Sequence, residues 1–138
     1  PDIKFYIMGS NPPEEILAMN SDSIIVKGFV TDEELDTFYR KCRLDVVPLR
    51  YGAGMKGKVI EAMYNKIPLI TTPIGAEGLK EFEEVMCVHE DADAFAECVI
   101  SLYEDYDRLD TMISHMPEFI EKYFSLNAAM NIIGQDIN

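Results

Sequence analysis

The sequence predicts an α/β fold, a Rossmann-like parallel sheet flanked by helices on both faces. Short apolar runs alternate along the chain with segments of helical periodicity or composition. Strands separated by helix-length crossovers lie parallel, and right-handed crossovers place helices on both faces of the sheet. At 138 residues, 48% of them apolar, the chain is long enough for one compact core, so we expect a single domain over residues 1–138.

The first third of the chain contains two expected strands and two expected helices. Residues 3–8 form a short apolar run, and the turn that follows places proline to open a helix at 14–19. A second strand is expected at 23–26. Thr31 and Glu34 then form a capping box, in which each side chain accepts a hydrogen bond from the other residue's backbone amide. The apolar residues that follow at helical spacing are Leu35, Phe38, Tyr39 and Cys42.

The rest of the chain continues the alternation. Three further strands are expected at residues 44–49, 68–72 and 85–89, and helices at 58–65, 92–102, 105–123 and 126–133. Pro117 falls inside the third of these helices, where a proline bends or restarts the helix.

The charge of the chain is strongly acidic but unevenly spread. The formal net charge of −13 argues against nucleic acid or an anionic bilayer as a general partner, because such surfaces are bound through positive fields. Residues 40–66 nevertheless carry +5, from seven basic and two acidic side chains, and the rest of the chain carries −18. A basic region of this kind suits a small anionic ligand such as a diphosphate, although a solvated surface of lysines gives the same pattern.

The cysteines and the apolar runs bear on location. Cys42, Cys87 and Cys98 are an odd number at wide spacing, which suits reduced thiols better than a disulfide framework or a metal site. No apolar run approaches the roughly 20 residues of a membrane-spanning helix, and residues 1–4 lack the basic start of a secretory signal. We expect a cytoplasmic protein, and attachment of the full-length protein to the inner face of the membrane stays open.

The basic region coincides with the expected functional edge of the sheet. Ligands of open parallel sheets bind at the carboxyl ends of the strands, and one of these ends leads into residues 50–56. Gly52 and Gly54 let the backbone turn sharply there, and the following helix presents free N–H groups and the positive end of its dipole. The combination predicts a phosphate site. It matches neither the dinucleotide fingerprint nor a P-loop, and a glycine-rich turn also serves simply to start a helix.

Lys58 and Glu61 stand three residues apart on the helix after this loop. At 100° per residue they lie close together, roughly opposite the apolar side of the helix. One interpretation is an exposed ion pair worth a few tenths of a kcal/mol. The other assigns Lys58 to diphosphate oxygens and Glu61 to two vicinal hydroxyls, because a carboxylate has two acceptor oxygens. Spacing alone does not separate the two.

Five motifs follow one another along the chain: residues 28–35 (GFVTDEEL), 44–48 (LDVVP), 54–62 (GMKGKVIEA), 67–70 (IPLI) and 72–77 (TPIGAE). In this order they resemble the carboxyl-terminal domain of the retaining glycosyltransferases of family 4, whose fold is called GT-B. The likeness covers about residues 3–136. It implies a donor-binding domain for transfer from a nucleoside-diphosphate sugar to a glycan or lipid-linked acceptor, as in the synthesis of surface polysaccharide.

The resemblance also implies roles for single residues. Lys56 and Glu61 are the expected catalytic residues, with Glu61 on the ribose hydroxyls and Lys56 facing the phosphates and sugar. No metal or other cofactor is expected, because backbone amides and basic side chains neutralise the diphosphate in this family. The residues expected to bind the donor are Gly28, Phe29 and Val30 beside the base, and Gly54, Met55, Lys56, Lys58 and Glu61 at the diphosphate, sugar and ribose.

The sequence departs from the family pattern in two places. The family commonly has two glutamates eight positions apart, and the position eight before Glu61 is Ala53. A subgroup with a G-A-G-x-K loop is closer, and in this chain the backbone amides of Ala53 to Met55 are expected to read the sugar hydroxyls instead. The family's Arg and Lys pair for the diphosphate, and its acceptor domain, precede the segment that begins at Pro1. We therefore expect a carboxyl-terminal half that lacks its first strand and helix and its amino-terminal partner domain, and that does not transfer sugar alone.

Other functions stay open beside this one. A sugar-nucleotide epimerase or a phosphorylase shares the two-domain fold, and a non-catalytic interaction or regulatory module shares the half-domain. A receiver-type module is disfavoured, because it needs acidic residues where this chain has Gly9-Ser10 and Arg50-Tyr51. His89 and His115 stand without neighbouring ligand residues, so neither is assigned a role. Residues 72–78 are either a turn or a place where Glu77 contacts the ligand.

Overall fold

The computed structural model describes residues 3–50, 52 and 57–137, and for residues 123–137 it describes the helix but not the side chains. The chain divides into two compact units, Pro1–Lys41 and Cys42–Asn138, and each is described by itself. Both are built from parallel strands accompanied by helices, which confirms the predicted α/β fold.

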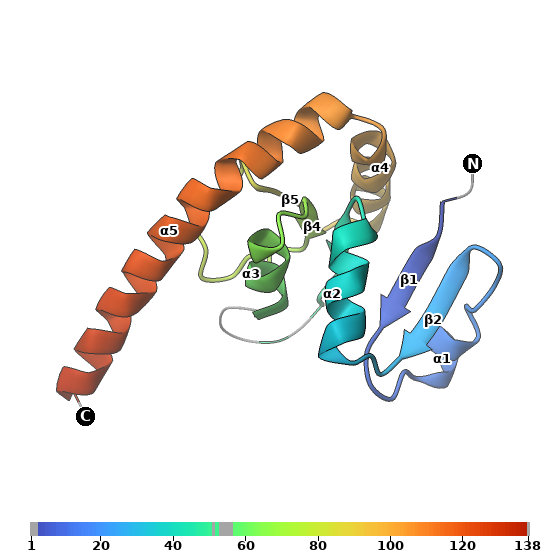
Figure 1. Ribbon diagram of the computed structural model, residues 1–138, viewed down its shortest axis with the longest axis horizontal. Coiled ribbons are helices and arrows are strands. Elements are labelled where there is room, and N and C mark those ends of the chain that lie inside the picture. The colour runs from blue at the N-terminus through green and yellow to red at the C-terminus, as the bar shows by residue number, and fades with distance from the viewer. Residues whose placement is uncertain (1–2, 51, 53–56, 138) are drawn as a thin grey trace. The chain divides into compact units, whose positions relative to one another are not determined.

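The first unit combines two parallel strands with two helices (Figure 1). Phe5 pairs with Ile24 at the start of the register. The Tyr6 ring meets the Phe38 ring with centroids 5.0 Å apart, so the second helix packs on that face of the strands. The elements in order are β1 (Phe5–Met8), α1 (Glu14–Leu17), β2 (Ile24–Gly28) and α2 (Asp32–Lys41).

The predicted capping box at the start of α2 is confirmed. The Glu34 amide donates to Thr31 Oγ1 at 3.1 Å, and the Thr31 amide donates to Glu34 Oε1 at 3.4 Å. The Thr31 hydroxyl also donates to the same carboxylate at 3.1 Å. These bonds satisfy amides that have no partner inside the helix, so the sequence itself marks where α2 begins.

Replacing Thr31 by alanine should destabilise the protein by about 1 kcal/mol, because the Glu34 amide loses its acceptor. Urea unfolding should show a lower midpoint at an unchanged slope. Thr37→Ala is the matched control, since Thr37 lies on the same helix and its hydroxyl donates only to the Glu33 carbonyl. Equal destabilisation by the two substitutions would show that loss of the helix cap is not the cause.

The second unit is built on a three-stranded parallel sheet in the order β3-β4-β5. Asp45 pairs with Leu69, and Leu69 pairs with Met86. Each strand is shorter than the sequence predicts. The elements in order are β3 (Asp45–Val47), α3 (Gly57–Tyr64), β4 (Leu69–Thr71), β5 (Met86–Val88), α4 (Ala92–Tyr103) and α5 (Tyr106–Ile137).

Two apolar clusters cover the two faces of this sheet. Side chains alternate between faces along a strand, so Leu69 and Thr71 lie on one face and Ile70 on the other. The sheet is therefore the middle of three layers, with α3 and α4 on its opposite sides (Figure 1). The first cluster contains Val47, Val59, Ile60, Ala62, Met63, Leu69, Ala76, Val85, Met86 and Met116. The second contains Ile70, Cys87, Leu102, Leu109 and Met112.

The carboxyl-terminal part of the chain differs from the prediction. Separate helices at 105–123 and 126–133 were expected, and this expectation is wrong, because α5 runs unbroken from Tyr106 to Ile137 with Pro117 inside it. A proline in a helix interior removes one hydrogen bond and costs about 3 kcal/mol. Met116 before the proline and Phe119 and Ile120 after it all pack on the first cluster. Continuous burial on both sides of Pro117 offsets that cost.

Two further features concern the expected location. Among the residues that the structure describes, none of the helices is both long and apolar enough to cross a membrane. Cys42, Cys87 and Cys98 are all free thiols.

Candidate functional site

The basic, glycine-rich segment leaves the sheet at its carboxyl edge. β3 and β4 end together because they are parallel neighbours. Beyond β3 the chain reaches the exposed Arg50, and Gly52 has a φ of 126°, a conformation that favours glycine. The next described element is α3, which begins at Gly57.

Two threonine hydroxyls tie β4 to the end of β3. Thr71 Oγ1 donates to the Val47 carbonyl at 2.7 Å, and Thr72 Oγ1 donates to the Leu49 carbonyl at 2.6 Å. Thr71 is fully buried. Because β3 ends at Val47, these bonds hold the backbone that enters the basic segment and fix its starting point.

The predicted site residues Lys58 and Glu61 both lie on α3 and are exposed. The opposite side of the helix anchors it, since Val59, Ile60 and Met63 are buried against the sheet. The structure therefore brings these two predicted residues together on the solvent side of a well-anchored helix. Within the described part of the chain, a Cβ added at Gly57, the first helical residue, would meet no atom within 4 Å.

The charge at the start of α3 is unlike that of the neighbouring helices. Each of the other four helices in the described part of the chain has acidic residues in its first turn, where they balance the positive end of the dipole. α3 has none there and carries Lys58 instead. A lysine at this end adds to the dipole instead of balancing it, so the start of α3 is a positive region suited to an anion.

Asp45 is a charged neighbour that the sequence analysis did not single out. Burial raises the pKa of Asp45 above its ordinary value, and Lys58 and Glu61 are both close enough to act on its charge, Lys58 lowering the pKa and Glu61 raising it. The signal in the sequence is one carboxylate inside the apolar strand Leu44-Asp-Val-Val. A half-buried carboxylate is thus electrostatically coupled to the two predicted residues.

The residues predicted to flank the base belong to the first unit. Gly28 ends β2 with a φ of 67°, and its carbonyl accepts a hydrogen bond from the Gly9 amide at 2.8 Å. Phe29 follows with 73% of its surface exposed, and Val30 is half-buried. An exposed phenylalanine at the carboxyl end of a parallel strand offers a flat apolar surface for stacking.

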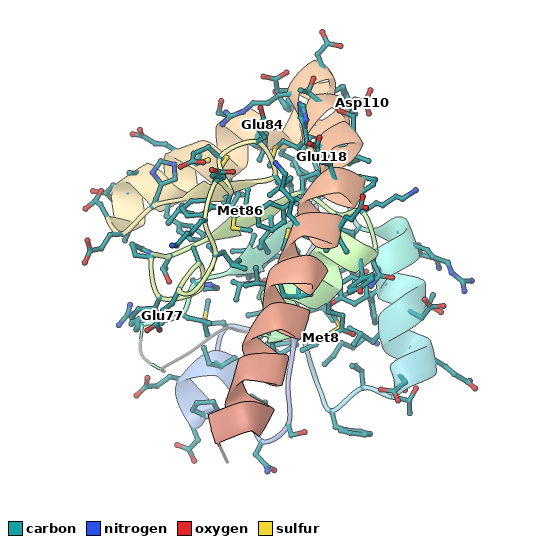
Figure 2. The ribbon with its side chains drawn as sticks, turned by 90° about the vertical axis from the view of Figure 1, so that its left-hand side faces the viewer. Met8, Glu77, Glu84, Met86, Asp110 and Glu118 are labelled. Atoms are coloured by element: carbon teal, nitrogen blue, oxygen red, sulfur yellow. The ribbon has the colours of Figure 1, made fainter. Side chains whose placement is uncertain are left out.

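Several predicted residues have no structural description. Ala53, Gly54, Met55 and Lys56 lie outside the described residues. Glu77 is described and is exposed, on the segment that follows β4, apart from Glu84 and Glu118 (Figure 2).

Part of the basic region has a structural explanation. Arg40 forms an ion pair with Asp36 on α2. The Arg43 guanidinium donates to the Tyr103 carbonyl at 2.9 Å and lies over the rings of Tyr103 and Tyr106. An exposed ion pair thus accounts for Arg40, and hydrogen bonding with ring stacking accounts for Arg43.

A cavity of about 260 Å³ lies elsewhere in the second unit, between residues 78–85 and α5. Glu84 and Glu118 lie at its rim (Figure 2), and His115 Nδ1 stands 3.3 Å from Glu84 Oε2. It includes none of the predicted site residues. Within the described ranges no three or more His, Cys, Asp or Glu residues are grouped so as to hold a metal ion.

Comparison with known proteins gives a family model and one curated relative. Residues 1–105 match the model described as "Glycosyl transferases group 1". An uncharacterised 44.6 kDa protein in the cps region of Klebsiella pneumoniae is 26% identical over 132 residues, which take in 90% of this chain and 34% of the relative. The chain thus spans about a third of the length of that relative.

Three solved structures share the fold. TarM superposes with a TM-score of 0.78 at 21% identity, over 96% of this chain and 28% of that one. Sucrose-phosphate synthase from Thermosynechococcus elongatus gives 0.74 at 20% identity, over 96% and 38%. The GtfA/B complex gives 0.69 at 20% identity, over 97% and 29%. The arrangement of parallel strands and flanking helices is thus that of a GT-B half-domain.

Proposed function

Because this chain belongs to the group 1 glycosyltransferases, we propose that it binds the nucleoside-diphosphate sugar donor for the transfer reaction. The single observation that carries the proposal is the start of α3, where Lys58 stands on the positive end of the helix with no acidic residue in the first turn. A diphosphate supplies the negative charge that this position favours. Arg50 and Lys56 add positive charge in the preceding segment.

Glu61 is proposed to recognise the ribose. Its exposed carboxylate is one turn along α3 from Lys58, so one helix face offers a cation for phosphate and an acceptor for hydroxyls. Two carboxylate oxygens accept hydrogen bonds from two vicinal hydroxyls. Phe29 and its neighbours Gly28 and Val30 are proposed to contact the base, supported by the exposure of the Phe29 ring.

We propose that Lys56 stabilises the leaving diphosphate, since a cation beside developing negative charge lowers the barrier. Gly54 and Met55 are proposed to approach the phosphates and sugar through their backbone. The reaction proposed is metal-independent, retains anomeric configuration and takes place in the cytoplasm or at the inner face of the membrane. The proposed acceptor is a glycan or lipid-linked acceptor bound by an amino-terminal partner domain, as in the synthesis of surface polysaccharide.

Calorimetry with the diphosphates of uridine, guanosine, adenosine, cytidine and thymidine tests the donor site. One of them should bind with a Kd between about 1 μM and 1 mM, the usual range of enzyme substrates. The matching nucleoside should bind at least about tenfold more weakly, because it lacks the charge that Lys58 is proposed to meet. Equal affinities for nucleoside and diphosphate, or no binding by any diphosphate, would refute a donor site at α3.

A transfer assay with the full-length protein tests the activity. Radiolabelled nucleotide sugar should give labelled glycan or lipid-linked product, with and without a chelator. Label that appears as a different nucleotide sugar would indicate an epimerase. With inorganic phosphate added, label that appears as sugar phosphate together with released nucleoside diphosphate would indicate a phosphorylase. Binding without any turnover would favour a regulatory module.

A further inference from the structure

Two cysteines meet on the α4 side of the sheet. Cys87 lies in β5 beside Ile70 of β4, and both side chains point to the face that the second cluster covers. Cys98 lies on α4, and its side chain packs on the same cluster, as do Phe95 and Val99. A side-chain hydrogen bond joins the two thiols. The strand and the helix therefore bring two sulfur atoms into contact across the interface between them.

A cation completes this group. The Arg108 guanidinium, near the start of α5, donates a hydrogen bond to the Cys87 sulfur at 3.2 Å. The backbone amide of Arg108 donates in turn to the Asp105 carboxylate at 3.1 Å, which holds this end of the helix. A guanidinium beside a sulfur favours its thiolate form. A buried cysteine that only fills space needs neither a second thiol nor a cation beside it.

The two thiols differ in how readily an oxidant reaches them. Cys87 is buried, with 7% of its surface exposed, whereas Cys98 is half-buried. Burial, with a smaller contribution from Cys98, raises the pKa of Cys87 to about 11, and Arg108 only partly counters this. The Cys87 thiol is therefore protonated at neutral pH, and Cys98 is the sulfur that a dissolved oxidant meets first.

We propose that Cys87 and Cys98 form a redox modification site, a dithiol that hydrogen peroxide oxidises to a disulfide between β5 and α4. The Cys98 sulfur attacks the peroxide, so that an S–O bond forms, the O–O bond breaks, and the leaving hydroxide takes the thiol proton to become water. The Cys87 sulfur then attacks the sulfenic acid, so that the S–S bond forms, the S–O bond breaks, and a second water leaves with the Cys87 proton. Arg108 stabilises the Cys87 sulfur as it gives up this proton.

The dithiol lies on the face of the sheet opposite α3, because the second cluster covers one face and the first cluster, which contains Val59 and Met63 of α3, covers the other. The inference therefore does not depend on donor binding. It gives the second unit a site whose state follows the oxidant level of its surroundings.

Peptide mass spectrometry tests the crosslink. Trypsin releases residues 81–108 as one peptide that contains both cysteines, because no lysine or arginine stands between Lys80 and Arg108. After treatment of the folded protein with stoichiometric hydrogen peroxide and then an alkylating agent, this peptide should be unalkylated and two hydrogens lighter. A reductant added before alkylation should restore two alkylated cysteines. Two cysteines that stay open to alkylation, or Cys98 oxidised to the sulfinic acid without a crosslink, would overturn the proposal.

Two variants check which groups take part. Cys42→Ser is the matched control, since Cys42 is an exposed free thiol, and it should form the crosslink as the natural protein does. Loss of the crosslink in this variant would make Cys42 a partner and overturn the assignment. Arg108→Gln should slow crosslinking by at least about threefold, because the cation beside Cys87 is lost. An unchanged rate would remove Arg108 from the proposed site.

The melting temperature tests whether the native fold accommodates the bond. The oxidised protein should melt at least about 5 °C above the reduced protein, because the crosslink restricts the unfolded chain, and a reductant should reverse the gain. Cys98→Ala should melt at the same temperature with and without peroxide. A lower melting temperature after oxidation of the natural protein would overturn the proposal, because the disulfide would then form only by distorting the contact between β5 and α4.

Discussion

Replacing Glu61 by alanine should weaken binding of the cognate nucleoside diphosphate by about 30- to 150-fold and leave binding of inorganic pyrophosphate unchanged. The reason is the proposed contact of one carboxylate with two ribose hydroxyls. Hydrogen bonds to a charged acceptor contribute about 1.5–3 kcal/mol each, and loss of the pair in an exposed site is expected to cost about 2–3 kcal/mol. Calorimetry on both ligands measures the difference, because pyrophosphate has no ribose.

Two controls isolate the ribose contact. Glu97→Ala removes an exposed carboxylate from α4 and should leave both affinities unchanged. The 2′-deoxy form of the nucleotide should bind more weakly than the parent to the unchanged protein, and equally with it to Glu61→Ala. If deoxy and parent nucleotides still differ in the variant, Glu61 is not the ribose acceptor. If pyrophosphate binding falls as far as nucleotide binding, Glu61 acts on the phosphate site instead.

Replacing Gly75 by alanine should destabilise the protein by about 2–4 kcal/mol, the range expected for an overpacked core that also loses a buried hydrogen bond. A Cβ at this position would stand 1.8 Å from Thr71 Oγ1 and 3.1 Å from Thr71 Cβ. Thr71 is fully buried, and its hydroxyl donates to the Val47 carbonyl. Rotating Thr71 away would leave that carbonyl without its partner. The substitution therefore strains the bond that holds the end of β3.

Urea unfolding measures this effect, with Gly57→Ala as the matched control. A methyl group at Gly57 meets no atom of the described residues within 4 Å, and alanine is the better helix former, so this variant should be as stable as the natural protein or slightly more stable. A second variant, Gly75→Ala combined with Thr71→Ala, removes the γ atoms that clash and should be no less stable than Thr71→Ala alone by more than about 1 kcal/mol. Equal unfolding midpoints for Gly75→Ala and Gly57→Ala would contradict the close contact.

Family membership has a structural basis in the motifs that carry the resemblance. Residues 44–48 contain β3, residues 67–70 lead into β4, and residues 54–62 include most of α3. The motif at residues 72–77 supplies Thr72, which holds Leu49, and Gly75, which fits against Thr71. The last of these motifs thus supports the backbone that follows β3, whether or not Glu77 contacts a ligand.

The sequence by itself determined the order and type of the strands and helices up to α4, and it placed Lys58 and Glu61 on one exposed helix face. Both results come from local rules. Periodicity separates strand from helix, a capping box such as Thr31 with Glu34 marks a helix start, and residues three apart on a helix share a side.

Only the tertiary structure decided the features that depend on residues distant in the sequence. The sequence shows Asp45 only as one polar residue in a strand, and the fold half-buries it, which raises its pKa. The sequence predicts a helix bent or restarted at Pro117, but packing on both sides of this residue keeps α5 continuous. The sequence indicates only that Gly75 belongs to a turn, whereas the structure shows that a side chain at this position would clash with Thr71. In each case the deciding energy is burial or a contact across the fold, which no local pattern encodes.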